Sequence, residues 1–354
     1  MKTIELSLSP AYCSNWTAAM ALREFIANAM DSGDPHWTIN QANSTIVITN
    51  KGTLPLSSLL MGSSAKPSSD AIGQFGEGFK VGIAVLISKG ATIRIQNNDT
   101  NWDFSVVHSD TFEAAVLQVQ MYDLPHPSDN ITVIIHCPPE LYQELYYATQ
   151  SLMPPLVPIM RLGDVGILKT KGIFVSGLQV CEPNFFFGYN FHPRAIALNR
   201  DRTHFDTDQA SRIICQCIED NASHMQLLEL SVPIFNILEE GAYDDFRYLT
   251  WYPNDFPRIR SALMEIIAAK SDGKTLTDHR TAQLGRSGYY LSYGLSAIAR
   301  GGAYGSQNSH LFAEINQEEW FKELETLLAK HRNSLRRDTR VDFDKLLTKY
   351  RKTK

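Results

Sequence analysis

The sequence predicts an α+β protein whose first domain is a mixed, mostly antiparallel sheet with helices on one face. Three observations predict it: an apolar helical stripe over residues 21–31, an apolar run after a glycine-rich turn at 73–78, and Ile- and Val-rich segments between 45 and 136. A helix with one apolar stripe packs on a core, and short segments with partial alternation are typical of strands.

The first helix carries polar groups at a regular spacing. Its apolar residues fall at positions 22, 25, 26, 29 and 30, which is the spacing of one buried helical face. Glu24, Asn28 and Asp31 fall at i, i+4 and i+7, so they lie on a second face. An amide oxygen is a suitable ligand for Mg²⁺, and a carboxylate one turn away can polarise a water molecule.

Residues 45–52 read as a strand that runs into a turn, and the glycine-rich turn follows. Glycines at 73, 76 and 78 allow the backbone to approach a ligand closely, and the N-terminus of the next helix can bind a phosphate. The turn lacks the preceding strand of a dinucleotide-binding fold and the Gly-Lys-Ser/Thr ending of a P-loop.

Further strands are expected at 91–96, 102–107, 114–121 and 131–136, followed by a helix over 139–152. The Pro-rich segment 153–158 marks a boundary. Beyond it, 173–180 reads as a strand pair or a bulged strand, and helices are expected near 208–219 and 222–239. The predicted domains are 1–152, a second α/β domain over 153–240, and a region 241–354 that ends in a basic helical tail.

Together these motifs resemble the GHKL superfamily of gyrase, heat-shock chaperone, histidine kinase and MutL. The family's first box, Glu-x-x-x-Asn-Ala-x-Asp, matches from Glu24 to Asp31, and its glycine box matches at Gly73, Gly76 and Gly78. The middle box departs from the pattern, because Asn50 stands in place of the adenine-binding Asp and Leu54 in place of a second glycine. The resemblance implies a Bergerat-type α/β sandwich for residues 1–152.

The resemblance also implies ATP and Mg²⁺ as cofactors, with Glu24 as the general base, Asn28 as the metal ligand and Asp31 near the adenine or the metal. The side-chain oxygen of Asn50 could accept a hydrogen bond from the adenine amino group, or its NH₂ group could turn outward and favour a base with a carbonyl. The other positions implied at the nucleotide are Gly52, Ser64, Lys66, Gly73, Phe75, Gly76, Glu77, Gly78, Phe79, Lys80 and Thr132. The alternative for Lys80 is a solvated residue on a helix face.

Two further regions are assigned by the same resemblance. Residues 61–72, rich in Ser, Gly and Ala, take the place of a mobile lid. A second domain of this type lends a cation to the γ-phosphate, and Arg200 and Arg202 are the candidates, with Lys169 and Lys171 as alternatives. A surface Arg-Asp-Arg salt-bridge cluster would explain the same arginines without a nucleotide.

Composition sets the remaining limits. Hydrophobic residues make up 44% and charged residues 20% of the 354 residues, which is ordinary for a globular protein. No apolar run reaches membrane-helix length, no signal peptide is recognised, and the five cysteines lack metal-ligand spacing. A cytoplasmic protein with reduced thiols and no membrane contact is therefore expected.

The C-terminal tail differs in charge from the rest of the chain. Residues 330–354 hold ten Lys or Arg and three Asp, a net of +7, whereas the whole chain carries −5. The tail could bind nucleic-acid phosphates, dock on the protein's own acidic surface, or stay solvated.

Three classes of function stay open from the sequence. The first is a slowly hydrolysing ATPase that switches conformation and dimerises with nucleotide, in a nucleic-acid transaction or in phage-related defence. The second is a nucleotide-binding module without useful turnover. The third, a kinase of the histidine-kinase type, is disfavoured because no phospho-acceptor helix hairpin is recognised.

Overall fold

The computed structural model describes residues 1–12, 15–34, 36–60, 77–198, 205–272, 274–278 and 288–301. The chain divides into two compact units. The first consists of residues 1–222 together with 243–245, and the second of residues 223–242 and those from 246 onward.

A seven-stranded sheet begins the first unit, with the strand order β1-β6-β5-β4-β7-β3-β2. Each pair of neighbouring strands in this sheet is antiparallel. The strands are β1 (Lys2–Glu5), β2 (Thr38–Ala42), β3 (Thr45–Lys51), β4 (Thr92–Asn97), β5 (Thr100–Ser109), β6 (Ala114–Asp123) and β7 (Asn130–His136). The predicted α+β class is confirmed, and β1 and β2 are the strands of this sheet that the sequence analysis missed.

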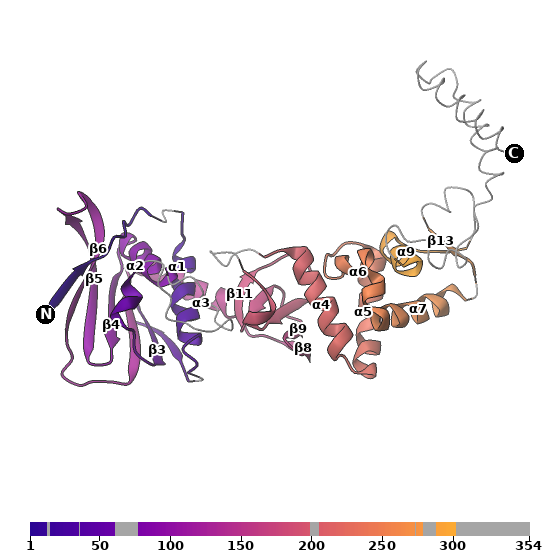
Figure 1. The fold of residues 1–354 in the computed structure, drawn as a ribbon, viewed down its shortest axis with the longest axis horizontal. Coiled ribbons are helices and arrows are strands. Elements are labelled where there is room, and N and C mark those ends of the chain that lie inside the picture. The colour runs from indigo at the N-terminus through magenta and orange to yellow at the C-terminus, as the bar shows by residue number, and fades with distance from the viewer. Residues whose placement is uncertain are drawn as a thin grey trace, which may run out of the picture. The chain divides into compact units, whose positions relative to one another are not determined.

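Helices α1 (Ala18–Met30), α2 (Gly78–Ser88) and α3 (Pro139–Leu152) cover one face of this sheet (Figure 1). Strand residues on that face are buried in alternation, as Ile46, Ile48 and Asn50 show on β3. Helix α1 begins at its N-cap Thr17 and packs against α2, α3 and β3. Because α1 has neighbours on several sides, its polar residue Glu24 is buried together with the apolar stripe.

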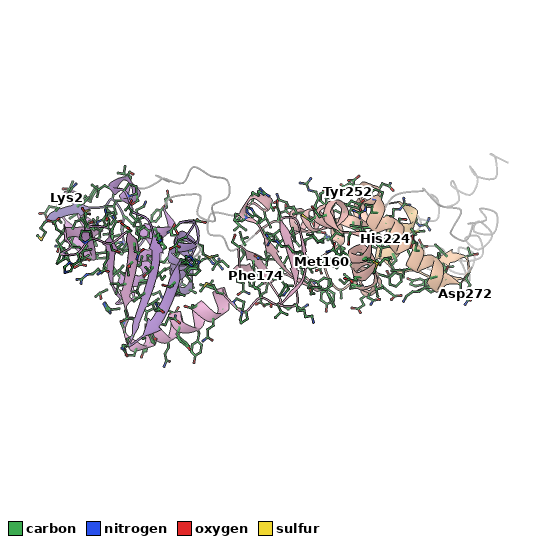
Figure 2. The ribbon with its side chains drawn as sticks, turned by 90° about the horizontal axis from the view of Figure 1, so that it is seen from below. Lys2, Met160, Phe174, His224, Tyr252 and Asp272 are labelled. Atoms are coloured by element: carbon green, nitrogen blue, oxygen red, sulfur yellow. The ribbon has the colours of Figure 1, made fainter. Side chains whose placement is uncertain are left out.

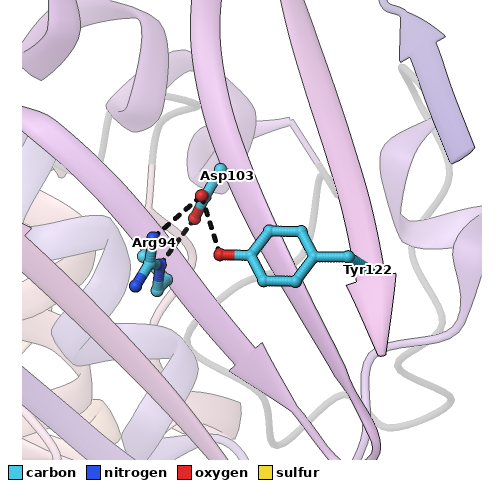
Figure 3. A network of polar contacts seen from close by, with 3 residues as sticks. All are labelled: Arg94, Asp103 and Tyr122. Atoms are coloured by element: carbon cyan, nitrogen blue, oxygen red, sulfur yellow. Dashed lines mark hydrogen bonds and ion pairs between the residues drawn. The ribbon is translucent and has the colours of Figure 1, made fainter. Parts of the chain in front are cut away.

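The opposite face of the sheet is polar. There Arg94 of β4 donates two hydrogen bonds to Asp103 of β5, at 2.7 and 2.9 Å, and Tyr122 of β6 donates a third at 2.9 Å (Figure 3). The hydrogen bond from Arg94 holds the pKa of Asp103 below its ordinary value. Since the Arg94 and Asp103 side chains are partly solvated, this network contributes little to stability.

The first unit continues into a five-stranded sheet with the order β11-β10-β12-β9-β8. Only the β10–β12 pair among its described pairings is parallel. The strands are β8 (Pro158–Leu162), β9 (Val165–Leu168), β10 (Ile173–Val175), β11 (Leu178–Cys181) and β12 (Gly188–Phe191). Phe174 and Met160, both labelled in Figure 2, lie in its buried core. Segment 173–180 is thus a strand pair, one of the two predicted forms.

Helix α4 (Thr207–Asn221) packs on β8, and residues 243–245 complete the first unit. The Asp245 carboxylate is fully buried and accepts hydrogen bonds from Phe186 N, Phe187 N and the Tyr189 hydroxyl, at 2.5, 3.1 and 2.7 Å. Burial raises the pKa of Asp245 above its ordinary value although these hydrogen bonds act in the opposite direction. Asp245 therefore fixes the loop before β12.

The second unit is helical in the part that the structure describes, apart from the short parallel pair β13 (Leu276–Thr277) and β14 (Tyr289–Tyr290). Its helices are α5 (His224–Glu240), α6 (Arg247–Trp251), α7 (Pro257–Ser271) and α9 (Tyr293–Arg300). Over the described ranges, no helix of either unit has the length and apolar character needed to cross a bilayer. The four described cysteines are free thiols.

Candidate functional site

The two main sequence motifs meet at one point. The Glu24 side chain is 4% exposed, and its carboxylate lies so close to Gly78 that a Cβ atom on Gly78 would overlap it. Gly78 is the first residue of α2, where backbone N–H groups have no partner within the helix and attract negative charge. The structure therefore places the predicted general base at a helix N-terminus that suits an anion.

Close packing of α1 on α2 sets this position. A Cβ atom on Gly82 would lie 3.1 Å from Ala21 O, so a glycine there allows the helices to approach each other closely. The rings of Phe25 and Phe79 meet edge to face, with 5.8 Å between their centroids. Phe79, predicted at the nucleotide, thus takes part in the packing that holds Glu24 beside Gly78.

Asn28 and Asp31 follow Glu24 on the same side of α1, as their spacing predicts. Asn28 is half-buried, and Asp31 is the C-cap residue, whose backbone N–H donates to Ala27 O at 2.9 Å. Asn28 therefore presents its amide one helical turn beyond Glu24.

Asn50 is the last but one residue of β3, on the sheet face that the helices cover, and its side chain is 7% exposed. Its Nδ2 group donates to Lys51 O at 2.9 Å. One of the two NH₂ hydrogens is thus used by the protein's own backbone, and in this orientation Oδ1 is the atom that can accept from a ligand.

The turn after Asn50 is held by the side chain of Asn97, a residue that the sequence analysis did not single out. Gly52 has φ +126°, which favours glycine, and its N–H donates to Asp129 O at 3.0 Å. The Asn97 side chain accepts from Leu54 N at 2.8 Å and donates to Leu54 O at 2.9 Å. This bidentate contact spans more than forty positions, so no local sequence pattern indicates it.

Thr132 lies on the other face of the sheet. It pairs with Thr49 across β7 and β3, and the Thr49 hydroxyl donates to the Thr132 hydroxyl at 3.3 Å. Asn50 pairs with Ile131 instead, so the alternation of β7 puts Thr132 and Asn50 on opposite faces. The structure does not bring Thr132 to the side of Glu24.

The solvated alternative for Lys80 is wrong. Its side chain is only 1% exposed, and Nζ donates to Ser58 O at 2.6 Å and to Leu60 O at 2.8 Å. Burial lowers the pKa of Lys80 below its ordinary value. Lys80 thus ties α2 to the 3₁₀ helix η1 (Leu56–Leu59), which follows the turn after β3.

Glu77 is the N-cap residue of α2, and its carbonyl accepts from Lys80 N and Val81 N. Lys171, an alternative phosphate cation, donates to Phe185 O and Phe186 O, and its Nζ lies 4.8 Å from the Phe186 ring centre. Several predicted features lie outside the described residues: Ser64, Lys66, the lid at 61–72, Gly73, Phe75, Gly76, Arg200, Arg202 and the tail at 330–354.

The protein ligands for a metal are few. No group of three or more His, Cys, Asp or Glu side chains within the described ranges could hold a metal ion. Mg²⁺ in nucleotide sites uses one or two protein oxygens together with phosphates and waters. The amide oxygen of Asn28 fits this kind of site, and it does not fit a cage built from protein ligands alone.

Similarity to known proteins is found among solved structures alone. No family model and no curated protein matches the sequence. The chain is similar in structure to the ATPase region of Saccharomyces cerevisiae topoisomerase II bound to dexrazoxane, at 10% identity and a TM-score of 0.33, over 53% of this chain and 77% of that one. A second structure of that region gives 12% identity and a TM-score of 0.32, over 52% and 76% of the two chains.

The B-subunit of DNA gyrase from Myxococcus xanthus is also similar, at 8% identity and a TM-score of 0.28, over 51% of this chain and 81% of that one. At identities of 8–12% and TM-scores of 0.28–0.33, the likeness supports no conclusion about the activity of this chain.

Proposed function

We propose that the first unit binds ATP with Mg²⁺ between α1, the N-terminus of α2 and the end of β3, and that it hydrolyses ATP slowly. The observation that carries the proposal is the contact between Glu24 and Gly78, which joins two motifs lying more than fifty residues apart in the sequence. A carboxylate beside the N-terminus of a helix can accept a proton from a water that attacks a bound phosphate.

Each described residue has one role in this proposal. Glu24 takes the proton of the attacking water, and Asn28 offers its amide oxygen to the metal. The N–H groups at the start of α2 bind phosphate oxygens. Mg²⁺ supplies neutralisation of the phosphate charge when bound. The Oδ1 atom of Asn50 accepts from the amino group of adenine.

The test of this proposal is calorimetric titration of the purified chain with a non-hydrolysable ATP analogue, with Mg²⁺ and with EDTA. We expect binding in Mg²⁺ and a loss of about tenfold or more in EDTA. Asn28→Ala should bind as weakly in Mg²⁺ as the wild type binds in EDTA. Asn40→Ala, on the edge strand β2, is the control and should behave as wild type. A wild type that does not bind in Mg²⁺ would refute the site.

Base selectivity tests the adenine assignment separately. Since the NH₂ group of Asn50 donates to Lys51 O, its free acceptor matches the amino group of adenine and opposes the carbonyl of guanine. We expect ATP to compete at least about tenfold better than GTP for a fluorescent nucleotide, which corresponds to one hydrogen bond lost and one acceptor left unsatisfied. Tighter binding of GTP would show that the NH₂ group of Asn50, and not Oδ1, faces the base.

Partners and location stay proposals. Nucleotide-dependent pairing of two copies, nucleic-acid binding through the tail at 330–354 and a cytoplasmic location are the expectations from the sequence. If the tail binds nucleic acid, the affinity for DNA should fall steeply as the salt concentration rises, and removal of the tail should abolish binding.

A further inference from the structure

Arg23 lies next to Glu24 on α1, and it is buried. Its side chain is 8% exposed, and its Nη2 atom donates to Gln179 O at 2.5 Å and to Val180 O at 3.4 Å. Both acceptors belong to β11 of the five-stranded sheet. Helix α1 thus contacts β11 of the five-stranded sheet through Arg23, and the start of α2 through the neighbouring Glu24.

The geometry of β11 explains why its carbonyls receive a side chain. β11 is the edge strand of its sheet, so one side of its backbone is not paired with another strand there. In the register with β10, Gln179 pairs with Phe174 and Cys181 with Ile173, and Val180 is left without an opposite residue. Such a bulge leaves backbone groups outside the ladder, and the guanidinium of Arg23 reaches two of its carbonyls.

The same helix holds the reacting group of the proposed site. Successive residues on a helix point about 100° apart, so Glu24 faces Gly78 while Arg23 faces β11. A helix with most of its turns buried moves as a rigid element. A shift of α1 on nucleotide binding would therefore displace β11 as well, because the Arg23 guanidinium links the two elements.

We propose that Arg23 is a positioning residue that couples the nucleotide site on α1 to the edge strand β11 of the second sheet. This inference rests on the proposed function. A guanidinium presents several donors in a fixed plane and can hold two carbonyls at once, whereas an ammonium is a single point charge and a methionine has no donor.

Hydrogen exchange on the full chain tests the coupling. Exchange of the backbone amides at 178–181 is measured with Mg²⁺ alone and with Mg²⁺ and the ATP analogue, in wild type, Arg23→Lys and Arg23→Met. In wild type we expect the analogue to slow exchange there about fivefold or more, the lower end of typical coupling between sites. Arg23→Met should bind the analogue within about threefold of wild type and show no slowing, with a lower kcat. Arg23→Lys should give an intermediate slowing.

Arg94→Met is the matched control, because it removes a guanidinium from the open face of the seven-stranded sheet. It should keep the wild-type response at 178–181. The same slowing in Arg23→Met as in wild type would overturn the coupling, as would binding by wild type without any change at 178–181. Failure of the wild type to bind the analogue would refute the proposed function itself, and the coupling with it. If Arg23→Met does not fold, the Arg23→Lys response decides alone, and a full wild-type response would overturn the proposal.

Discussion

Glu24→Gln should reduce the rate of ATP hydrolysis by about 10²- to 10⁴-fold, the range typical of losing a general base. The amide keeps the size of the side chain and cannot accept the proton of the attacking water. Affinity for the ATP analogue should stay within about threefold of wild type, because a base acts on the transition state more than on the bound ground state. Steady-state hydrolysis and calorimetric titration measure the two quantities.

Glu219→Gln is the control for this substitution. Glu219 is another buried glutamate, on α4, and its replacement tests whether loss of any buried carboxylate slows the reaction. Hydrolysis at the wild-type rate in Glu24→Gln would remove Glu24 from the mechanism. A wild type that binds ATP without turning it over would favour the binding module that the sequence leaves open.

Gly78→Ala should lower the hydrolysis rate by about 10²-fold, since a displacement of about 1 Å at a reacting group can cost that much. The added Cβ atom overlaps the Glu24 carboxylate, which must swing away because its side-chain atoms are the nearest neighbours of the new group. Overpacking of this kind also costs about 1–3 kcal/mol of stability. Hydrolysis and chemical denaturation of the variant measure both effects.

Two further variants test whether the overlap with Glu24 causes the losses of activity and stability in Gly78→Ala. In Gly166→Ala the new Cβ atom would lie 3.7 Å from Asn190 O, an ordinary contact, so this β9 variant should keep wild-type activity. In a Glu24→Ala background, Gly78→Ala should cost little stability, because the overlapping group is gone. An equal loss of stability in both backgrounds would mean that the clash does not involve Glu24.

The sequence predicted the elements of the first sheet well. Strands β4 to β7 and helices α1 to α3 have apolar patterns that a local window detects, because each buries one face. β1 and β2 were missed since both lie at sheet edges, where few side chains are buried and the pattern is polar.

The site was predicted in part. The meeting of Glu24 with the glycine-rich turn followed from the order of the motifs, and the structure adds the contact at Gly78. The environment of Lys80 could not be predicted, because its partners Ser58 O and Leu60 O are backbone atoms some twenty residues away. The face on which Thr132 lies depends on register, which the sequence of one strand does not determine.

Arg23 shows a second limit of sequence patterns. On a helical wheel it lies at the border of the apolar stripe of α1, where a charged residue is expected to extend toward water. It is buried because a second sheet lies against this side and presents two backbone carbonyls. A pattern read one helix at a time cannot include a partner strand more than 150 residues later.

Residues 243–245 belong to the first unit although they follow α5 of the second unit in the sequence. This order affects how the first unit forms during synthesis and whether it can be isolated as a fragment. Asp245 accepts from two backbone N–H groups before β12 and from Tyr189, yet it is made only after α5. On the ribosome, the second sheet therefore lacks this acceptor until α5 has been translated. A fragment that ends at Ala222 lacks it permanently, so the first unit cannot be separated intact by a single cut in the chain.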